Sequence, residues 1–174
     1  LDDSKPKVAF VSSEFMADFA KGYEMAKNKP IVVEVVTGVD HGCNISEQPL
    51  SDILAKYPAD EALVPQALDD PFLLLYSSGT TGHPKGILLS NRNQYSVCKD
   101  MARFGITEPG DIFMIVAPMF HTNPLCVWTY PYMYQGLSLV IRKRYSPDDY
   151  WGPILQYGVT TIWGVPAMYM YVMH

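Results

Sequence analysis

The sequence has few cysteines, and their spacing gives no paired motif. Cys43, Cys98 and Cys126 are the three cysteines among 174 residues, and no Cys-x-x-Cys motif occurs. An odd number of widely spaced cysteines argues against a disulfide framework and a zinc site. His41 lies close to Cys43, but without further ligands nearby we interpret it as a loop histidine rather than a metal ligand. Free thiols suit a reducing compartment, and residues 1–5 lack a signal-peptide pattern, so we expect a cytoplasmic protein.

Dense basic runs are also scarce. The net charge is −5, and the densest basic run is Arg142-Lys143-Arg144. We therefore do not expect a nucleic-acid partner. Residues 1–70 hold 6 Lys+Arg and 13 Asp+Glu, whereas residues 71–174 hold 7 and 5. The more positive part of the chain suits an anionic ligand.

Charged residues are absent from residues 112–141, a stretch that is long enough to cross a membrane. Pro118, Pro124 and Pro131 interrupt this stretch, and polar residues such as His121 lie inside it. These interruptions favour the strands and helix of a buried α/β core over a transmembrane segment.

Expected strands and helices alternate along the chain. We expect strands over 7–12, 31–36, 72–76, 112–117, 137–141 and 160–164. We expect helices over 13–27, 52–56, 91–104 and 124–135, with a break near Pro131, and from Pro147 and Pro166 onward. The alternation predicts an α/β fold of βαβ units with a largely parallel sheet.

Two of these helices have a predicted N-cap. Ser90 precedes the helix over 91–104, and Gly105 follows it. Ser146 is followed by Pro147 and two aspartates, a pattern typical of a helix start. We therefore expect replacement of Ser146 by Ala or Gly to cost about 0.5–2 kcal/mol or less.

Residues 74–86, LLYSSGTTGHPKG, form the most informative segment. Glycines permit positive φ and close approach to a ligand, while hydroxyl and backbone N–H groups donate to phosphate oxygens. Lys85 adds a positive charge with three donors. An ordinary surface turn does not need this combination. The common P-loop would need glycine at position 84 and a hydroxyl at 86, so we interpret the segment as a strand followed by a different nucleotide-phosphate loop.

The string from Tyr76 to Gly86 resembles the phosphate-loop signature of the AMP-forming acyl-activating enzymes. A second segment, APMFHTN at 117–123, resembles the motif of that superfamily that ends in a substrate-facing aromatic residue or histidine. The superfamily contains acyl-CoA synthetases, adenylation domains of peptide synthetases and firefly-type luciferases. The PMFH stretch and residues 145–151 are more similar to the coenzyme A ligases than to the peptide-synthetase domains.

The resemblance implies a two-step reaction. A carboxylate attacks the α-phosphate of ATP, with Mg²⁺, to give an acyl-adenylate and pyrophosphate, and the thiol of coenzyme A then displaces AMP. The implied partners are therefore ATP, Mg²⁺, coenzyme A and a small carboxylic acid. The residues implied to bind the β- and γ-phosphates are Ser77, Ser78, Gly79, Thr80, Thr81, Gly82 and Lys85. Lys85 and His121 are the implied catalytic residues, and His121 would lie beside the acyl carboxylate and the approaching thiol; a histidine hydrogen-bonded into the core is the alternative.

An acyl pocket is implied less directly. By analogy with the family, its lining would be Leu125, Trp128, Tyr132, Met133 and the strand end Trp163-Gly164. Aromatic residues and methionine at helical spacing are more often part of a core, and we favour that interpretation.

The resemblance also predicts that parts of the family's catalytic apparatus are missing. The Tyr-Gly-x-Thr-Glu segment, whose glutamate holds Mg²⁺, is not in this sequence, nor are the ribose-binding aspartate, the hinge and the C-terminal lysine. We expect a piece of a larger N-terminal domain, truncated at both ends, with a βαβ unit and linker over 1–70 and the phosphate-loop portion over 71–174. This piece alone should not complete the reaction. The alternative is a non-enzymatic truncated homologue or interaction module.

Overall fold

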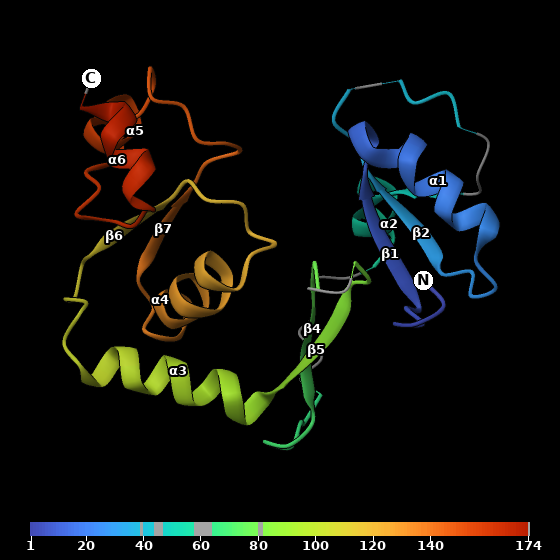
Figure 1. The fold of residues 1–174 in the computed structure, drawn as a ribbon, viewed down its shortest axis with the longest axis horizontal. Coiled ribbons are helices and arrows are strands. Elements are labelled where there is room, and N and C mark those ends of the chain that lie inside the picture. The colour runs from blue at the N-terminus through green and yellow to red at the C-terminus, as the bar shows by residue number, and fades with distance from the viewer. Residues whose placement is uncertain (39, 44–46, 58–63, 80–81, 174) are drawn as a thin grey trace. The chain divides into compact units, whose positions relative to one another are not determined.

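The chain folds as two compact units, Leu1–Val64 and Pro65–His174 (Figure 1). The computed structural model describes residues 1–38, 40–43, 47–57, 64–79 and 82–173. The division lies a few residues before the expected boundary at residue 70. That the two parts belong to one larger domain stays a prediction.

The first unit contains a parallel three-stranded sheet in the order β1-β2-β3. Its elements are β1 (Val8–Ser12), α1 (Met16–Met25), β2 (Ile31–Val35), β3 (Glu47–Pro49) and α2 (Leu50–Lys56), with a short 3-10 turn over Ser13–Phe15. The parallel pairing of β1 with β2 confirms the expected βαβ unit. The helix ends at Met25, two residues earlier than expected, because Ala26 takes an extended conformation.

The second unit begins with an antiparallel hairpin that leads directly into a helix. Strands β4 (Pro71–Ser77) and β5 (Lys85–Ser90) pair, and α3 (Asn91–Arg103) follows β5. Ser90 accepts a hydrogen bond from the backbone N–H of Asn93, and the Asn93 side chain accepts one from the Ser90 N–H. This capping box confirms the N-cap predicted at Ser90.

A second parallel sheet, in the order β7-β6-β8, forms the centre of this unit. Its strands are β6 (Ile112–Ile115), β7 (Ser138–Ile141) and β8 (Thr161–Ile162). Alternate residues of β6 face opposite sides of the sheet, as the period of a strand requires. Phe113 packs with Tyr132 on one face, and Met114 packs with Tyr150 on the other. The sheet is therefore covered on both faces, which is typical of a parallel α/β core.

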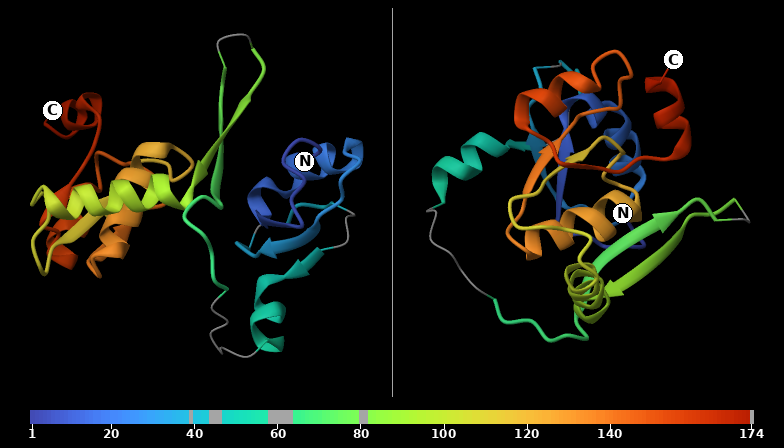
Figure 2. Two further views of the ribbon diagram at one scale, coloured as in Figure 1. Left: turned by 90° about the horizontal axis from the view of Figure 1, so that it is seen from below. Right: turned by 90° about the vertical axis from the view of Figure 1, so that its left-hand side faces the viewer.

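The uncharged stretch over 112–141 forms β6, a loop, a helix and β7. The helix starts as a π-helix over Asn123–Thr129 and continues as α4 (Tyr130–Tyr134), with Pro131 in the first turn of α4. Helix α3 packs along the π-helix and α4, on the side of these helices that faces away from the sheet (Figure 2). Within the described residues, no helix is both long and apolar enough to span a membrane.

The helix start predicted at Ser146 is wrong. Helix α5 (Trp151–Tyr157) begins four residues after Pro147, the predicted first helical residue, and its N-cap position, Tyr150, makes no side-chain cap. Asp149 is instead bound by the guanidinium of Arg142, and the Tyr150 N–H donates to the carbonyl of Pro147 at 3.4 Å. The residues after Ser146 therefore form a turn held by Arg142, the residue that follows β7, instead of the predicted helix start. The last helix, α6 (Pro166–Val172), begins at Pro166 as predicted.

Candidate functional site

The predicted phosphate loop connects β4 to β5. Ser77 pairs with Lys85 in the antiparallel ladder, so the two ends of the loop are held side by side. Of the predicted phosphate-binding residues, the structure describes Ser77, Ser78, Gly79, Gly82 and Lys85. Thr80 and Thr81 lie outside the described residues.

Both glycines of this loop have positive φ, +60° at Gly79 and +83° at Gly82. A Cβ atom on Gly79 would lie 2.2 Å from the carbonyl oxygen of His83 and 3.7 Å from Cγ of Lys85. A side chain at position 79 would therefore collide with backbone, and the loop depends on glycine there. The stem of Lys85 passes close to Gly79, and Ser77, Ser78 and Lys85 are exposed. Two hydroxyls and one cation are thus available to an anion at the base of the loop.

His121 lies in the loop that follows β6, at the carboxyl edge of the second sheet. Its backbone N–H donates to the carbonyl of Pro118 at 3.1 Å, and its ring centroid lies 4.6 Å from that of Phe120. The residue is exposed and borders a cavity of about 540 Å³. The residues that line this cavity are Ala117, Pro118, His121, Thr122, Asn123, Pro124, Trp163, Val165 and Met168.

Two distant segments of the chain build this cavity. Residues 117–124 follow β6, whereas Trp163, Val165 and Met168 follow β8 or belong to α6. Because β6 and β8 are parallel neighbours, their carboxyl ends meet at the same edge of the sheet, where open α/β folds bind ligands. Sequence reasoning suggested Trp163 but not Val165 or Met168, since the order of the strands was not known.

Two of the four helix residues suggested as an acyl-pocket lining, Trp128 and Tyr132, belong to the core. The Trp128 and Tyr132 rings lie 5.1 and 4.8 Å from the Phe113 ring, centroid to centroid. Burial raises the pKa of Tyr132 above its ordinary value. The structure thus agrees with the favoured core interpretation for Trp128 and Tyr132, while Met133 is exposed.

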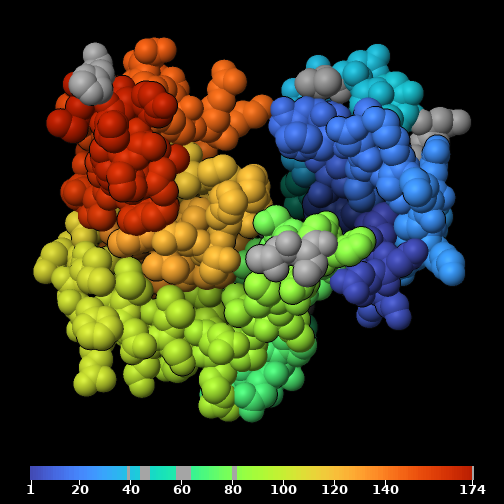
Figure 3. All heavy atoms as spheres, viewed as in Figure 1, coloured from blue at the N-terminus to red at the C-terminus, as the bar shows by residue number. Residues whose placement is uncertain are grey.

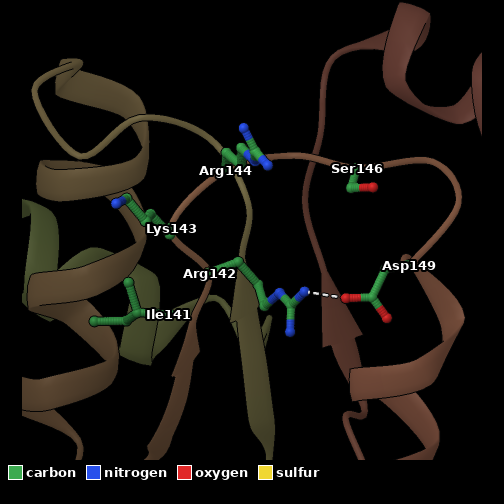
Figure 4. Close-up of a pocket in the computed structure, with 6 residues that line it drawn as sticks. All are labelled: Ile141, Arg142, Lys143, Arg144, Ser146 and Asp149. Carbon is green, nitrogen blue, oxygen red and sulfur yellow. Dashed lines mark hydrogen bonds and ion pairs between the residues drawn. The ribbon is translucent and has the colours of Figure 1, made fainter.

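The densest basic run lies in a separate place. Arg142, Lys143 and Arg144 follow β7 and, with Ile141, Ser146 and Asp149, line a pocket of about 370 Å³. The segment after β7, orange in the space-filling view, projects from the surface of the second unit (Figure 3). Arg142 binds Asp149, and the side chain of Lys143 points away from that aspartate (Figure 4). This pocket shares no lining residue with the cavity beside His121.

In the first unit, His41 takes part in a polar network at the ends of β1 and β2. Its Nε2 lies 3.4 Å from Oε1 of Glu34, which also accepts a hydrogen bond from Ser13 Oγ at 2.7 Å. The backbone N–H of Cys43 donates to His41 Nδ1 at 3.2 Å. Among the residues whose placement is described, no group of three or more His, Cys, Asp or Glu is arranged to hold a metal ion.

Comparison with known proteins identifies the relatives of this chain. The family model described as AMP-binding enzyme matches residues 1–174. The sulfoacetate–CoA ligase of Cupriavidus necator is 33% identical over 120 residues, which cover 69% of this chain and 24% of that ligase. ATP-bound MatB from Rhodopseudomonas palustris superposes with a TM-score of 0.80 at 24% identity, covering 99% of this chain and 32% of that protein. The N-terminal domain of FACL13 from Mycobacterium tuberculosis gives a TM-score of 0.80 at 21% identity, covering all of this chain and 41% of that one.

These comparisons differ in what they establish. At 24% and 21% identity the two structural likenesses establish the fold, which is the α/β fold predicted from the sequence. The chain spans 24% of the length of the sulfoacetate ligase, so a large part of that relative has no counterpart here. The family match covers the whole chain, including the glycine-dependent loop and the segment around His121. The chain belongs to the AMP-binding enzyme family, and its relatives are CoA ligases.

Proposed function

We propose that the protein activates a carboxylic acid with ATP and transfers the acyl group to coenzyme A. The carboxylate oxygen bonds to the α-phosphorus of ATP, with Mg²⁺, as pyrophosphate leaves. The thiol sulfur of coenzyme A then bonds to the acyl carbon as AMP leaves. The observation that carries the proposal is the closed loop after β4, in which Gly79 is required by its contact with the backbone of His83.

The loop would stabilise the negative charge on the leaving pyrophosphate. The proposed phosphate contacts are Ser77, Ser78, Gly79, Thr80, Thr81, Gly82 and Lys85. Pairing of Ser77 with Lys85 fixes the base of the loop before a ligand arrives. Donors that are held in place in advance stabilise developing charge better than donors that must reorganise during the reaction.

His121 would position the acid and the thiol at the cavity. Its exposed ring borders the cavity, which supports contact with a bound substrate. The cavity itself would hold the acyl group, with Trp163 on the opposite segment of its lining.

We also propose that these 174 residues do not complete the reaction by themselves. The chain covers 24% of the length of the sulfoacetate ligase, and the resemblance assigns the metal, ribose and adenylation-lysine contacts to segments outside this sequence.

Three free cysteines support a location in a reducing compartment, and we propose the cytoplasm.

Acid-dependent exchange of labelled pyrophosphate into ATP tests the first step. The assay would compare this chain with the complete open reading frame that contains it, using fatty, aromatic and polar acids. We expect exchange from the longer protein alone. Absence of exchange with every acid, in a longer protein that is folded, would contradict the proposed function.

A substitution in the loop tests the assignment of the phosphate contacts. Thr80→Val should lower exchange by about 10²–10³-fold, the usual loss for one preorganised donor. Thr37→Val makes the same change at an exposed threonine of the first unit and should exchange at the parent rate. If both variants match the parent, the loop does not bind the phosphates.

The role of His121 is tested by separating the two steps. His121→Ala should slow thioester formation with coenzyme A more than adenylate formation, measured in single-turnover experiments. An unchanged rate in both steps would remove His121 from the mechanism.

A further inference from the structure

The lining of the cavity beside His121 contains no strong charge. Among its nine lining residues, all of which the structure describes, there is no Asp, Glu, Lys or Arg. One segment of the lining carries Trp163, Val165 and Met168, and the facing segment carries two prolines. Thr122 and Asn123 add neutral polar groups. A methionine thioether adapts to ligands of different shapes, so this lining suits an apolar tail of variable form.

Four cations of the second unit, three in the basic run after β7 and one in the hairpin, line other sites. Arg142, Lys143 and Arg144 line the pocket after β7, and Arg142 is already bound to Asp149. Lys85 lies at the base of the hairpin loop. A second negative charge on a bound acid would therefore lose its hydration, and no cation of the lining would compensate it. This desolvation is energetically costly.

We propose that this cavity selects a carboxylic acid with an uncharged, apolar tail over an acid with a second negative charge. The inference rests on the proposed function, because it requires the cavity to hold the acyl group. It also differs from what sequence identity alone suggests. The relative that is 33% identical is named for sulfoacetate, an acid that carries a sulfonate, and this lining offers that group no cation.

A matched pair of acids tests the selection. Butanoate and succinate have the same number of carbons, and succinate replaces the terminal methyl group with a second carboxylate. With the complete protein, we expect kcat/KM for butanoate to exceed that for succinate, and for sulfoacetate, by at least about tenfold, a discrimination of the size that pocket contacts provide. Equal values, or a preference for succinate or sulfoacetate, would overturn the inference. Absence of activity with all acids would instead contradict the proposed function.

A charge placed in the lining tests whether this cavity is where the tail lies. Val165 lines the cavity, is 44% exposed and directly precedes α6, so a lysine there fits without disturbing the core. Val165→Lys should lower the butanoate-to-succinate ratio by about tenfold, the equivalent of 1.4 kcal/mol. Met170→Lys is the control, because Met170 belongs to the same helix, is 61% exposed and does not line the cavity.

The ratio of two acids on one variant cancels a general loss of active protein. If Val165→Lys does not fold, Thr122→Lys repeats the test at an exposed position on the facing segment. A ratio that stays at the parent value in the folded variant would show that the acid tail lies elsewhere.

Discussion

The hairpin loop and the cavity beside His121 are built in different ways. The loop is a single segment between Ser77 and Lys85, closed by the pairing of two consecutive strands. The cavity joins residues 117–124 to residues 163–168, which meet because β6 and β8 are neighbours in a parallel sheet. The loop is therefore specified locally, whereas the cavity exists only once the sheet has formed.

The two sites also differ in the support beneath them. The hairpin is a two-stranded sheet whose apolar residues Leu74, Tyr76, Ile87 and Leu88 are exposed in this chain. Two-stranded hairpins gain little stability from their own packing. In contrast, Phe113 and Met114 of β6 are each 1% exposed, in clusters on opposite faces of the sheet. We therefore expect loop substitutions to change activity and substitutions beneath the cavity to change stability.

The largest expected effect is on activity, at Gly79. Gly79→Ala should lower pyrophosphate exchange by about 100-fold or more in the complete protein, because the new Cβ would displace backbone that positions phosphate donors. Gly38→Ala, in the first unit and outside the loop, is a matched control, since Gly38 also has positive φ but no heavy atom lies within 4 Å of the added Cβ. It should bear only the strain of the left-handed backbone, about 1–2 kcal/mol. Equal losses in the two variants would show that contact with His83 is not what makes Gly79 necessary.

Stability should respond most strongly at Phe113. Phe113→Ala removes a ring that packs on Trp128 and Tyr132, and should lower the free energy of unfolding of the second unit by about 3–5 kcal/mol. All three tryptophans, Trp128, Trp151 and Trp163, belong to this unit, so their fluorescence during urea unfolding reports on it directly.

Phe104→Ala makes the same change at a ring that is 74% exposed, just after α3. It should alter the free energy of unfolding by less than about 0.5 kcal/mol. Similar losses in the two variants would mean that the sheet does not carry the stability of this unit.

A smaller effect is expected at the two serines that precede helices. Ser90→Ala removes the hydroxyl of a formed capping box and should cost about 0.5–2 kcal/mol. Ser146→Ala should cost less than about 0.5 kcal/mol, because Ser146 caps no helix. The comparison uses the same fluorescence measurement. A cost at Ser146 larger than that at Ser90 would support the helix start expected from the sequence.

These serines show what could be predicted from the sequence. Ser90 caps a helix through Asn93, only three residues away, so a short segment is enough to predict this helix start. The signal at Ser146 looked equally strong, but Arg142 binds Asp149 across a turn, and this tertiary pair overrides the local preference. The three-residue strand β3 was missed because it is too short to show alternation.

The same limit explains the candidate site. Gly79 and Lys85 were recognisable because the chemistry of the loop lies within one run of residues. Val165 and Met168 were not, because nothing in their own segment indicates that β8 pairs with β6. Strand order decides which loops meet at the carboxyl edge, and this order follows from packing across the sheet rather than from any single motif.

The smallest expected effect lies at the opposite, amino edge of this sheet. Thr160 Oγ1 donates to Asp111 at 2.7 Å and accepts from the Ile112 N–H at 3.0 Å, which ties the start of β6 to the residue before β8. The backbone N–H of Glu108 and the Thr160 hydroxyl lower the pKa of Asp111 below its ordinary value. The folded state thus prefers the ionised carboxylate, and the stability it contributes is present above the unfolded-state pKa of about 3.9.

This contribution should disappear as the pH falls through the lower pKa of the folded state. Asp111→Asn should therefore slightly lower the urea midpoint of tryptophan fluorescence at pH 7, and the difference from the parent should shrink to nothing in stronger acid. Asp148→Asn, at an exposed aspartate in the turn before α5, removes one charge without breaking this network and serves as the control. A difference between Asp111→Asn and the parent that is the same at pH 7 and in strong acid would mean that the amino edge is tied by neutral hydrogen bonds alone. In that case the stability contributed by the amino edge would not depend on the charge of Asp111.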